Sequence, residues 1–158
     1  MSLTPEQQDW LGKAATAAVA SEQETGCPAE LTLAQAIFES AWGTRCPGNN
    51  ALGIKVHGSG PSQYILTHEY LNGKWAEMPL AFETYARLAD CFADHARLIQ
   101  QGVYAPVWRA YQANHNLDAF IAGVAARYAT DPDYFTKIDM EAHAPSVQAA
   151  IQQVRAEI

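Results

Sequence analysis

The chain has 158 residues, of which 49% are hydrophobic and 17% are charged, and its formal net charge is −7. This size and composition predict one globular domain over residues 1–158 and exclude a disordered chain. The negative charge argues against nucleic acid as a partner, because nucleic-acid binding depends on lysine and arginine contacts to phosphates. No apolar run approaches the roughly 20 residues of a membrane-spanning helix, so we expect no membrane span.

The first expected helix follows a capping-box pattern, in which Gln7 stands three positions after Thr4. Apolar residues recur at helical spacing behind this pattern, so the helix is predicted to run to about Glu24 and to end at Gly26. The polar N-terminus lacks the basic start and the apolar core of a signal peptide. We therefore expect either a signal that was removed or an export route of another kind.

A second helix is predicted from Thr32, which forms another capping-box pattern with Gln35, to the helix-stopping Gly43. Its residues are almost all apolar, which is typical of a buried helix. Glu39 is its single acid. A carboxyl group in apolar surroundings resists ionisation, so its pKa rises and it can hold a proton near neutral pH. Glu39 is therefore a candidate general acid, and a solvated glutamate in an ion pair is the alternative.

A β-hairpin is predicted over residues 63–79, after a loop rich in glycine, proline and asparagine. The dipeptide Asn72-Gly73 separates two runs of strand-forming residues, which is the strongest short-range hairpin signal. With this dipeptide as the turn, Tyr70 faces Trp75. Neighbouring residues of a strand point to opposite faces, so Glu69 projects away from that aromatic pair.

The rest of the chain is expected to be helical. Pro79 marks the end of the hairpin or an edge position, and a helix is predicted to begin at about Phe82. His95 falls on the apolar stripe of that helix, so we interpret it as a core histidine and not as a ligand. The further expected elements are helices over 104–113 and 117–128, the second capped by Asn116, a helix start at Pro132 capped by Asp131, and a final helix over about 146–158.

Three cysteines, Cys27, Cys46 and Cys91, have no metal-ligand spacing. The odd number allows one disulfide and one free thiol, but we favour three buried thiols. The chain also lacks a glycine-rich phosphate loop, a His-Glu-x-x-His zinc motif and a Gly-x-Ser-x-Gly elbow. We expect no metal and no cofactor.

Five segments of the chain carry motifs that occur together, in this order, in one known family. They are 36–43, with a Glu-Ser-x-Trp-Gly helix, 49–55, close to Asn-Asn-Leu-Phe-Gly-Ile-Lys, the hairpin segment 67–75, 82–85, close to Phe-Arg-x-Tyr, and 128–138, with Tyr-Ala-Thr-Asp-Pro-x-Tyr-x-x-Lys-Ile. Together they resemble the glucosaminidase domain of glycoside hydrolase family 73, which includes flagellar peptidoglycan hydrolases and bacterial autolysins. The matches cover roughly residues 30 to 140, and two departures are Ala41, where the family usually has Gly, and Leu52, where it has Phe.

The resemblance implies a mostly helical α+β, lysozyme-like fold, in which a helical lobe and a small β-hairpin lobe flank a glycan groove. It implies an endo-β-N-acetylglucosaminidase that cleaves the β-1,4 bond after N-acetylglucosamine in peptidoglycan. The expected partner is the peptidoglycan glycan strand, bound by a monomer in the periplasm or at the cell wall. A phage, flagellar or other secretion route would suit a chain without a signal peptide.

The resemblance also assigns the two carboxylates. Glu39 falls on the family's catalytic acid, and Glu69 falls on the second carboxylate proposed in the hairpin. Glu69 either activates water in an inverting reaction or positions the substrate's own N-acetyl group in an assisted one. Glu77, on the same hairpin, is the rival candidate. A hairpin on a mobile lobe would let the groove close over substrate.

Four further residues are candidates for binding or catalysis. The family pattern favours Tyr134 as a catalytic tyrosine near the cleaved bond, with Tyr128 as a substrate-binding neighbour. Trp42 is either a stacking platform for a sugar ring or part of the core. Asn50 either binds an acetamido group or only satisfies the hydrogen bonds of its turn.

Two other functions compete with this one. A lytic transglycosylase shares the fold and the helix glutamate, needs no second carboxylate and leaves an anhydro sugar. A non-catalytic glycan-binding or assembly domain would keep only the fold. Glu39 argues against that domain, because a binding module has no need of an acid in an apolar helix.

Overall fold

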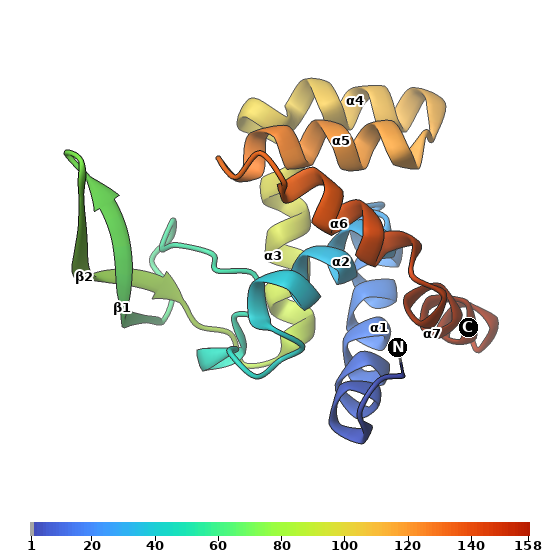
Figure 1. The fold of residues 1–158 in the computed structure, drawn as a ribbon. Coiled ribbons are helices and arrows are strands. Elements are labelled where there is room, and N and C mark those ends of the chain that lie inside the picture. The colour runs from blue at the N-terminus through green and yellow to red at the C-terminus, as the bar shows by residue number, and fades with distance from the viewer. Residues whose placement is uncertain (1) are drawn as a thin grey trace.

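The computed structural model describes residues 2–158. These residues form seven α-helices and one two-stranded antiparallel sheet, so the fold is α+β and mostly helical, as expected. The helices make one body and the hairpin projects from its side (Figure 1). The elements are α1 (Pro5–Thr25), α2 (Ala29–Ser40), β1 (Ser62–Leu71), β2 (Lys74–Glu83), α3 (Leu88–Ile99), α4 (Ala105–Asn114), α5 (Leu117–Tyr128), α6 (Tyr134–His143) and α7 (Pro145–Ala156), with short 3-10 turns at Pro47–Asn49 and Gly102–Tyr104.

Helix α1 begins and ends where the sequence predicts. The hydroxyl of Thr4 accepts a hydrogen bond from the backbone N–H of Gln7, and the side chain of Gln7 accepts one from the backbone N–H of Thr4. Gly26 follows the helix with φ +84°, a left-handed conformation that costs a glycine little. Both predicted signals of this helix are confirmed.

Helix α2 begins at Ala29, so the predicted start at Thr32 is wrong. Thr32 and Gln35 are buried inside the helix and do not cap it. The cap comes instead from another element, because the Glu22 carboxylate on α1 accepts a hydrogen bond of 2.9 Å from the backbone N–H of Ala29. A carboxylate at a helix N-terminus pairs an orphan donor and complements the helix dipole.

Helix α2 also ends earlier than predicted, at Ser40 and not at Gly43. Three successive residues after it, Ala41, Trp42 and Gly43, have φ values of 49°, 59° and 81°. This left-handed turn redirects the chain immediately behind Glu39. The hydroxyl of Ser40 supports the turn by accepting a hydrogen bond of 2.8 Å from the backbone N–H of Gly43.

The hairpin has the predicted register, with Tyr70 opposite Trp75 and Glu69 opposite Ala76. Pro79 pairs with Leu66 in the middle of β2 and does not end the hairpin. Both strands of a two-stranded sheet are edge strands, so a proline can stand there without breaking a shared ladder.

Strand β2 continues to Glu83, so the prediction of a helix from Phe82 is wrong. Phe82 pairs with Gln63 and forms an isolated bridge to Lys55, and its side chain is only 9% exposed. Burial of this aromatic ring between the hairpin base and the loop outweighs the helical pattern of the following residues. Helix α3 begins at Leu88 and buries His95 on its apolar stripe, as predicted.

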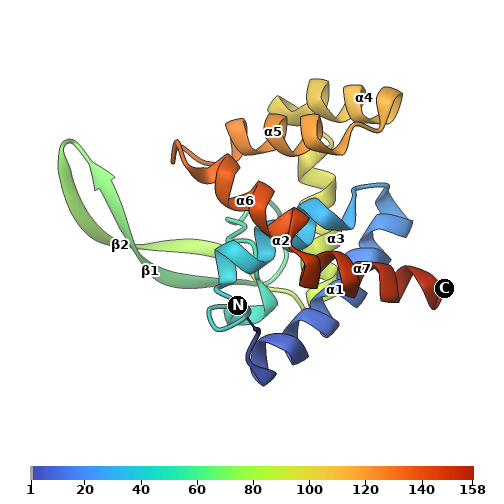
Figure 2. The ribbon, with the colours of Figure 1, turned by 45° about the vertical axis from the view of Figure 1, so that its right-hand side comes forward.

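Helix α2 lies between two hydrophobic clusters and contributes side chains to both. Leu33 and Ile37 belong to a cluster with α1, α3 and α7. Leu31 and Ala34 face the other way, into a cluster with α5 and α6. Every residue of α2 from 29 to 37 is buried, which confirms the predicted burial of this helix. Figure 2 shows α2 enclosed by the other helices. Each fully buried leucine or isoleucine adds about 1.5–3 kcal/mol to folding.

The C-terminal third is largely as expected. Asn116 caps α5 by accepting a hydrogen bond of 3.0 Å from the N–H of Ala119. Helix α6 begins at Tyr134, two residues after Pro132, and its N-cap residue is Asp133, so the predicted cap at Asp131 is wrong. Asp131 instead stabilises the preceding turn, accepting from the backbone N–H of Asp133.

Two chemical expectations can be compared with the fold. All three cysteines are free thiols, but only Cys27 and Cys91 are buried, and Cys46 is half-buried, so the prediction of three buried thiols is wrong for Cys46. Of the helices formed by residues 2–158, none combines the length and the apolar composition that crossing a membrane requires.

Candidate active site

A cavity of about 620 Å³ lies between the C-terminal end of α2 and the base of the hairpin. The loop that joins these two elements forms its floor. The cavity therefore occupies the place where a groove between a helical lobe and a hairpin lobe was expected. Its lining residues are Glu39, Gly43, Thr44, Arg45, Cys46, Pro47, Asn50, Gly53, Ile65 and Phe82.

Glu39 is half-buried in the wall of this cavity, in the last turn of α2. Burial raises the pKa of its carboxyl group, and a hydrogen bond from Tyr134 partly opposes that rise. The hydroxyl of Tyr134 donates this bond to Oε1 over 3.2 Å. A carboxyl group with a raised pKa that still reaches a cavity has the properties of a general acid.

Tyr134 is the first residue of α6 and is 1% exposed. The ring of Tyr128 stacks on it, with centroids 5.9 Å apart and planes at 4°, and the hydroxyl of Tyr128 donates to the backbone oxygen of Leu52 at 3.0 Å. Burial raises the pKa of both phenols, so both remain neutral hydrogen-bond donors. The Asp-Pro turn between the two tyrosines thus places Tyr134 in contact with Glu39, and Tyr128 stacks on the ring of Tyr134.

Two buried polar side chains extend this network away from the cavity. Gln35 Nε2 donates to the hydroxyl oxygen of Tyr134 at 3.0 Å, and Gln35 Oε1 lies 2.7 Å from Nε2 of His95. The sequence does not mark either residue as part of this network, because the capping-box pattern predicts a cap at Gln35 and the apolar stripe predicts a core histidine at position 95. The available signal was a polar residue at position 35, one helical turn before Glu39, in a helix expected to be buried.

Trp42 is half-buried and packs against the protein core. Its ring lies edge-on to Trp10, with centroids 6.4 Å apart and planes at 74°, and it contacts the cluster of α1, α3 and α7. These contacts favour the core alternative for Trp42 over a sugar-stacking platform.

Asn50 is 5% exposed and builds the loop at the floor of the cavity. Its side-chain amide donates to the backbone oxygens of Ile54 and Glu83, and its side-chain oxygen accepts from the backbone N–H groups of Leu52 and Ile54. Because backbone groups take up the whole amide, the geometry favours the turn-stabilising alternative for Asn50.

Glu69 lies on the same face of β1 as Ile65, which lines the cavity, and its carboxylate accepts a hydrogen bond of 3.2 Å from the hydroxyl of Thr67. Glu77 lies on the opposite face, where its carboxylate is 3.7 Å from Nε2 of His68. Glu69 stands three pairs from the turn, and the turn end of the hairpin points away from the helices (Figure 1). The structure therefore directs Glu69 to the cavity face but does not bring it beside Glu39.

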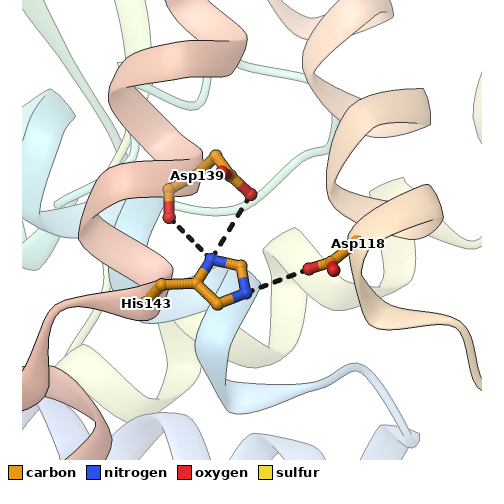
Figure 3. Close-up of side chains that lie close together, drawn as sticks. All are labelled: Asp118, Asp139 and His143. Carbon is orange, nitrogen blue, oxygen red and sulfur yellow. Dashed lines mark hydrogen bonds and ion pairs between the residues drawn. The ribbon is translucent and has the colours of Figure 1, made fainter.

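A separate group with metal-ligand chemistry joins α5 to α6 (Figure 3). Nε2 of His143 lies 2.9 Å from a carboxylate oxygen of Asp118, and Nδ1 lies 2.9 Å from the backbone oxygen of Asp139 and 3.3 Å from its carboxylate. The two carboxylates thus face opposite edges of the ring. The acceptors, with the Asp139 backbone oxygen first, raise the pKa of His143. A charged imidazolium satisfies this arrangement, and the three side chains also each offer one ligand atom within 4.8 Å of the other two.

A comparison of the sequence with models of known protein families shows to which family the chain belongs. The sequence model of the family described as mannosyl-glycoprotein endo-beta-N-acetylglucosaminidase matches residues 15–142. The chain belongs to this glucosaminidase family. The matched range contains Glu39, Asn50, Glu69, Tyr128 and Tyr134, so every candidate of the proposed catalytic groove lies within the glucosaminidase match.

Individual glucosaminidase-family relatives resemble the chain over most of its length. It is 35% identical over 150 residues to an autolysin of Enterococcus faecalis, covering 88% of this chain and 20% of the relative. It is 39% identical over 114 residues to a probable N-acetylmuramidase of Lactococcus lactis, covering 66% of this chain and 26% of the relative. The chain therefore spans about a quarter or less of the length of these curated relatives.

A solved structure supports the glucosaminidase fold. The catalytic domain of the autolysin Auto from Listeria monocytogenes superposes with a TM-score of 0.79 at 26% identity, covering 96% of this chain and 89% of that domain. The expected lysozyme-like architecture, a helical body with a small hairpin, is confirmed by this similarity together with the observed elements.

Proposed function

We propose that the chain is a peptidoglycan hydrolase that cleaves the β-1,4 bond after N-acetylglucosamine, with Glu39 as general acid. The observation that carries the proposal is the position of Glu39, which is half-buried at a cavity wall, has a raised pKa and accepts a hydrogen bond from Tyr134. The similarity to autolysins supports the substrate class.

In the proposed reaction, protonated Glu39 donates its proton to the oxygen of the glycosidic bond as that bond breaks. The carboxylate that remains carries a negative charge that it lacked before the step. The hydroxyl of Tyr134, already directed at Oε1, binds that charge more strongly than it binds the neutral acid. Tyr134 therefore favours the transition state over the ground state.

Glu69 is proposed as the second carboxylate. The hairpin bends toward the helical body when glycan fills the cavity, and this motion carries the face of Ile65 and Glu69 over the substrate. Glu69 then activates the attacking water, as in an inverting glycosidase, or holds the substrate's acetamido group if that group attacks. The anomeric configuration of the first product, read by NMR, separates these two routes.

The proposal also sets the place of action. Peptidoglycan as substrate implies action in the periplasm or at the cell wall, by a monomer that binds glycan strands. The chemistry needs only the two carboxylates, the tyrosine and water.

The relatives carry different names, autolysin and probable N-acetylmuramidase, so the cleaved bond is the point to test. Purified peptidoglycan is digested with the wild type, with Glu39→Gln and with Glu77→Gln as an exposed matched control, and the products are identified by mass spectrometry. The proposal is supported if the wild type and Glu77→Gln produce reducing N-acetylglucosamine ends and Glu39→Gln does not.

The other outcomes contradict it in distinct ways. Reducing muramic ends would make the chain a muramidase, and anhydro-muramic ends would make it a lytic transglycosylase. No cleavage by the wild type, with glycan binding retained, would make it a binding domain.

A further inference from the structure

A chain of three hydrogen bonds behind Glu39 joins α3, α2 and α6. It runs from Nε2 of His95 to Oε1 of Gln35 at 2.7 Å, from Nε2 of Gln35 to the hydroxyl of Tyr134 at 3.0 Å, and from that hydroxyl to Oε1 of Glu39 at 3.2 Å. His95, Gln35 and Tyr134 are 1%, 0% and 1% exposed. Because these groups are buried away from water, each must find its hydrogen-bond partner among other groups of the protein.

The tautomer of His95 sets which group donates and which accepts in each of these three hydrogen bonds. Nδ1 of His95 is buried without a hydrogen-bond partner among residues 2–158. A hydrogen on Nδ1 would be an unpaired buried N–H, which proteins rarely tolerate, whereas an unpaired acceptor is less costly. The ring hydrogen therefore belongs on Nε2, where it is donated to Oε1 of Gln35.

The remaining directions follow from this tautomer. Gln35 uses its oxygen toward His95, so it presents its N–H to the hydroxyl oxygen of Tyr134. Tyr134 accepts there and has its own hydrogen left for Glu39. With the amide of Gln35 turned over, every bond would reverse, and Glu39 would donate its proton to Tyr134 instead of the glycan.

We propose that His95 and Gln35 are positioning residues that fix the direction of this chain and so keep the proton of Glu39 on Oε2, the oxygen that does not accept from Tyr134. The inference rests on the proposed role of Glu39 as general acid. Neither positioning residue touches the substrate in this scheme, since both act through Tyr134.

His95, the first donor in this row of hydrogen bonds, stays neutral under the conditions in which the enzyme would work. Burial lowers the pKa of His95 to about 4, against the opposing charge of Asp94 on the same helix. Two tyrosines also lie beside the ring: Tyr128, with centroids 6.1 Å apart, and Tyr104, which lines the same cavity as His95. Glu39 in turn is faced by Tyr134, by Tyr128 behind it, and by Arg45 and Cys46 in the cavity wall.

The first test reads the tautomer in the unaltered protein. Nitrogen-15 NMR of the labelled chain between about pH 5.5 and 8 is expected to show His95 with a hydrogen on Nε2 and a bare Nδ1. A hydrogen on Nδ1, or a charged ring in this range, would overturn the proposal. This measurement needs neither a variant nor a substrate.

The second test compares two substitutions of similar size. His95→Gln retains an N–H donor near the position of Nε2, whereas His95→Met retains none. His95→Met is expected to free Gln35, to weaken the bond from Tyr134 that holds the pKa of Glu39 down, and so to raise that pKa. His95→Gln is expected to leave the Glu39 pKa, followed by carbon-13 NMR of its carboxyl group, at the wild-type value.

Kinetics on soluble uncrosslinked glycan strands give the corresponding functional readout. His95→Met is expected to lower kcat about tenfold, the scale of one lost orienting hydrogen bond, with KM unchanged. A general acid works while protonated, so the alkaline limb of its kcat–pH profile shifts to higher pH. Adding Tyr134→Phe to His95→Met is expected to cost no more than Tyr134→Phe alone, because both changes break one chain.

The outcomes separate this inference from the proposed function. A folded His95→Met with the wild-type Glu39 pKa and pH profile would overturn the inference. If His95→Met does not fold, the inference is tested by the Glu39 pKa of Gln35→Met and by the His95 tautomer of the wild type. A wild type that cleaves no glycan would overturn the proposed function, while both NMR measurements would still report the direction of the chain.

Discussion

The hydroxyl of Tyr134 donates a hydrogen bond of 3.2 Å to the carboxyl group of Glu39, although the two residues are 95 positions apart in the chain. The bond links the first turn of α6 to the last turn of α2 at the wall of the cavity. It brings together two distant segments that both carry the resemblance to the glucosaminidase family. The surroundings of Glu39 favour its protonated form, and this has a consequence for stability.

Glu39→Gln is expected to stabilise the protein at neutral pH. A carboxyl group whose folded pKa is raised stabilises the fold fully below its unfolded pKa of about 4.5, and loses that contribution as the pH rises through the folded pKa. Glutamine is neutral throughout, so the variant should exceed the wild type in free energy of unfolding at pH 7 and match it near pH 4. Urea unfolding at both pH values tests this, with Glu77→Gln as control. The same variant should lose roughly 10²- to 10⁴-fold in kcat. A stability difference that does not change with pH would contradict the argument.

The hairpin register predicts that its two glutamates differ in function. Glu69 shares the face of Ile65 at the cavity, whereas Glu77 pairs with His68 on the other face. We expect Glu69→Gln to lower kcat on glycan strands at least about tenfold, because a carboxylate acting as general base contributes this much or more. Glu77→Gln should stay within about twofold of the wild type, since a solvated surface pair contributes little. Equal effects of the two substitutions would count against the assignment of Glu69.

The left-handed turn behind Glu39 predicts a stabilising substitution. Ala41 has φ 49° and ψ 60°, a conformation that strains any residue with a Cβ atom. Ala41→Gly removes that strain but adds freedom to the unfolded chain, so we expect a net gain of about 0.5 to 1 kcal/mol. Thermal and urea unfolding measure it. A destabilised variant would show that the alanine methyl group contributes packing that outweighs the strain.

Gly43 should behave in the opposite way, although it belongs to the same turn. Its φ is 81°, and a Cβ atom added there would lie 2.1 Å from Nε1 of Trp10. Gly43→Ala should therefore destabilise the protein by roughly 2 to 4 kcal/mol, through the clash and the backbone strain together. The same unfolding experiments compare the two variants directly, and a neutral Gly43→Ala would contradict the packing of Trp10 against the turn.

The ion-pair group of α5 and α6 predicts a pH-dependent contribution to stability. The pKa of His143 is raised above 6.5, first by the backbone oxygen of Asp139 and then by the carboxylates of Asp139 and Asp118. Its stabilisation is thus complete below about pH 6.5 and is lost as the pH rises through the raised pKa. The free energy of unfolding of the wild type minus that of His143→Gln should fall by up to about 1 kcal/mol across this range, because solvent screens these pairs.

A matched variant tests the partner in this group. Asp118→Asn keeps the shape of the side chain and removes one charge, so it should reduce the pH dependence without abolishing it, since the Asp139 oxygens remain. If the free energy of unfolding depends on pH in both variants as it does in the wild type, ionisation of His143 is not the cause of that dependence.

Local signals in the sequence were sufficient for the features that depend on neighbouring residues. The capping box at Thr4, the Asn72-Gly73 turn with its register and the cap at Asn116 all have their predicted hydrogen bonds or pairings. The apolar pattern around Glu39 also predicted its raised pKa. Burial of that helix follows from composition alone, and burial is the main cause of the shift.

Other features depended on contacts between distant segments, and only the tertiary structure decided them. Helix α2 starts at Ala29 because Glu22 from another helix caps it, and Phe82 continues a strand because Gln63 and Lys55 pair with it. The chain from His95 through Gln35 to Tyr134 joins three helices. Spacing along one helix cannot show which buried polar side chains meet, because hydrogen bonds of this kind are set by packing between elements. The sequence by itself thus determined the family and the mostly helical class and marked Glu39 as the candidate acid, and the tertiary structure decided which residues surround its carboxyl group.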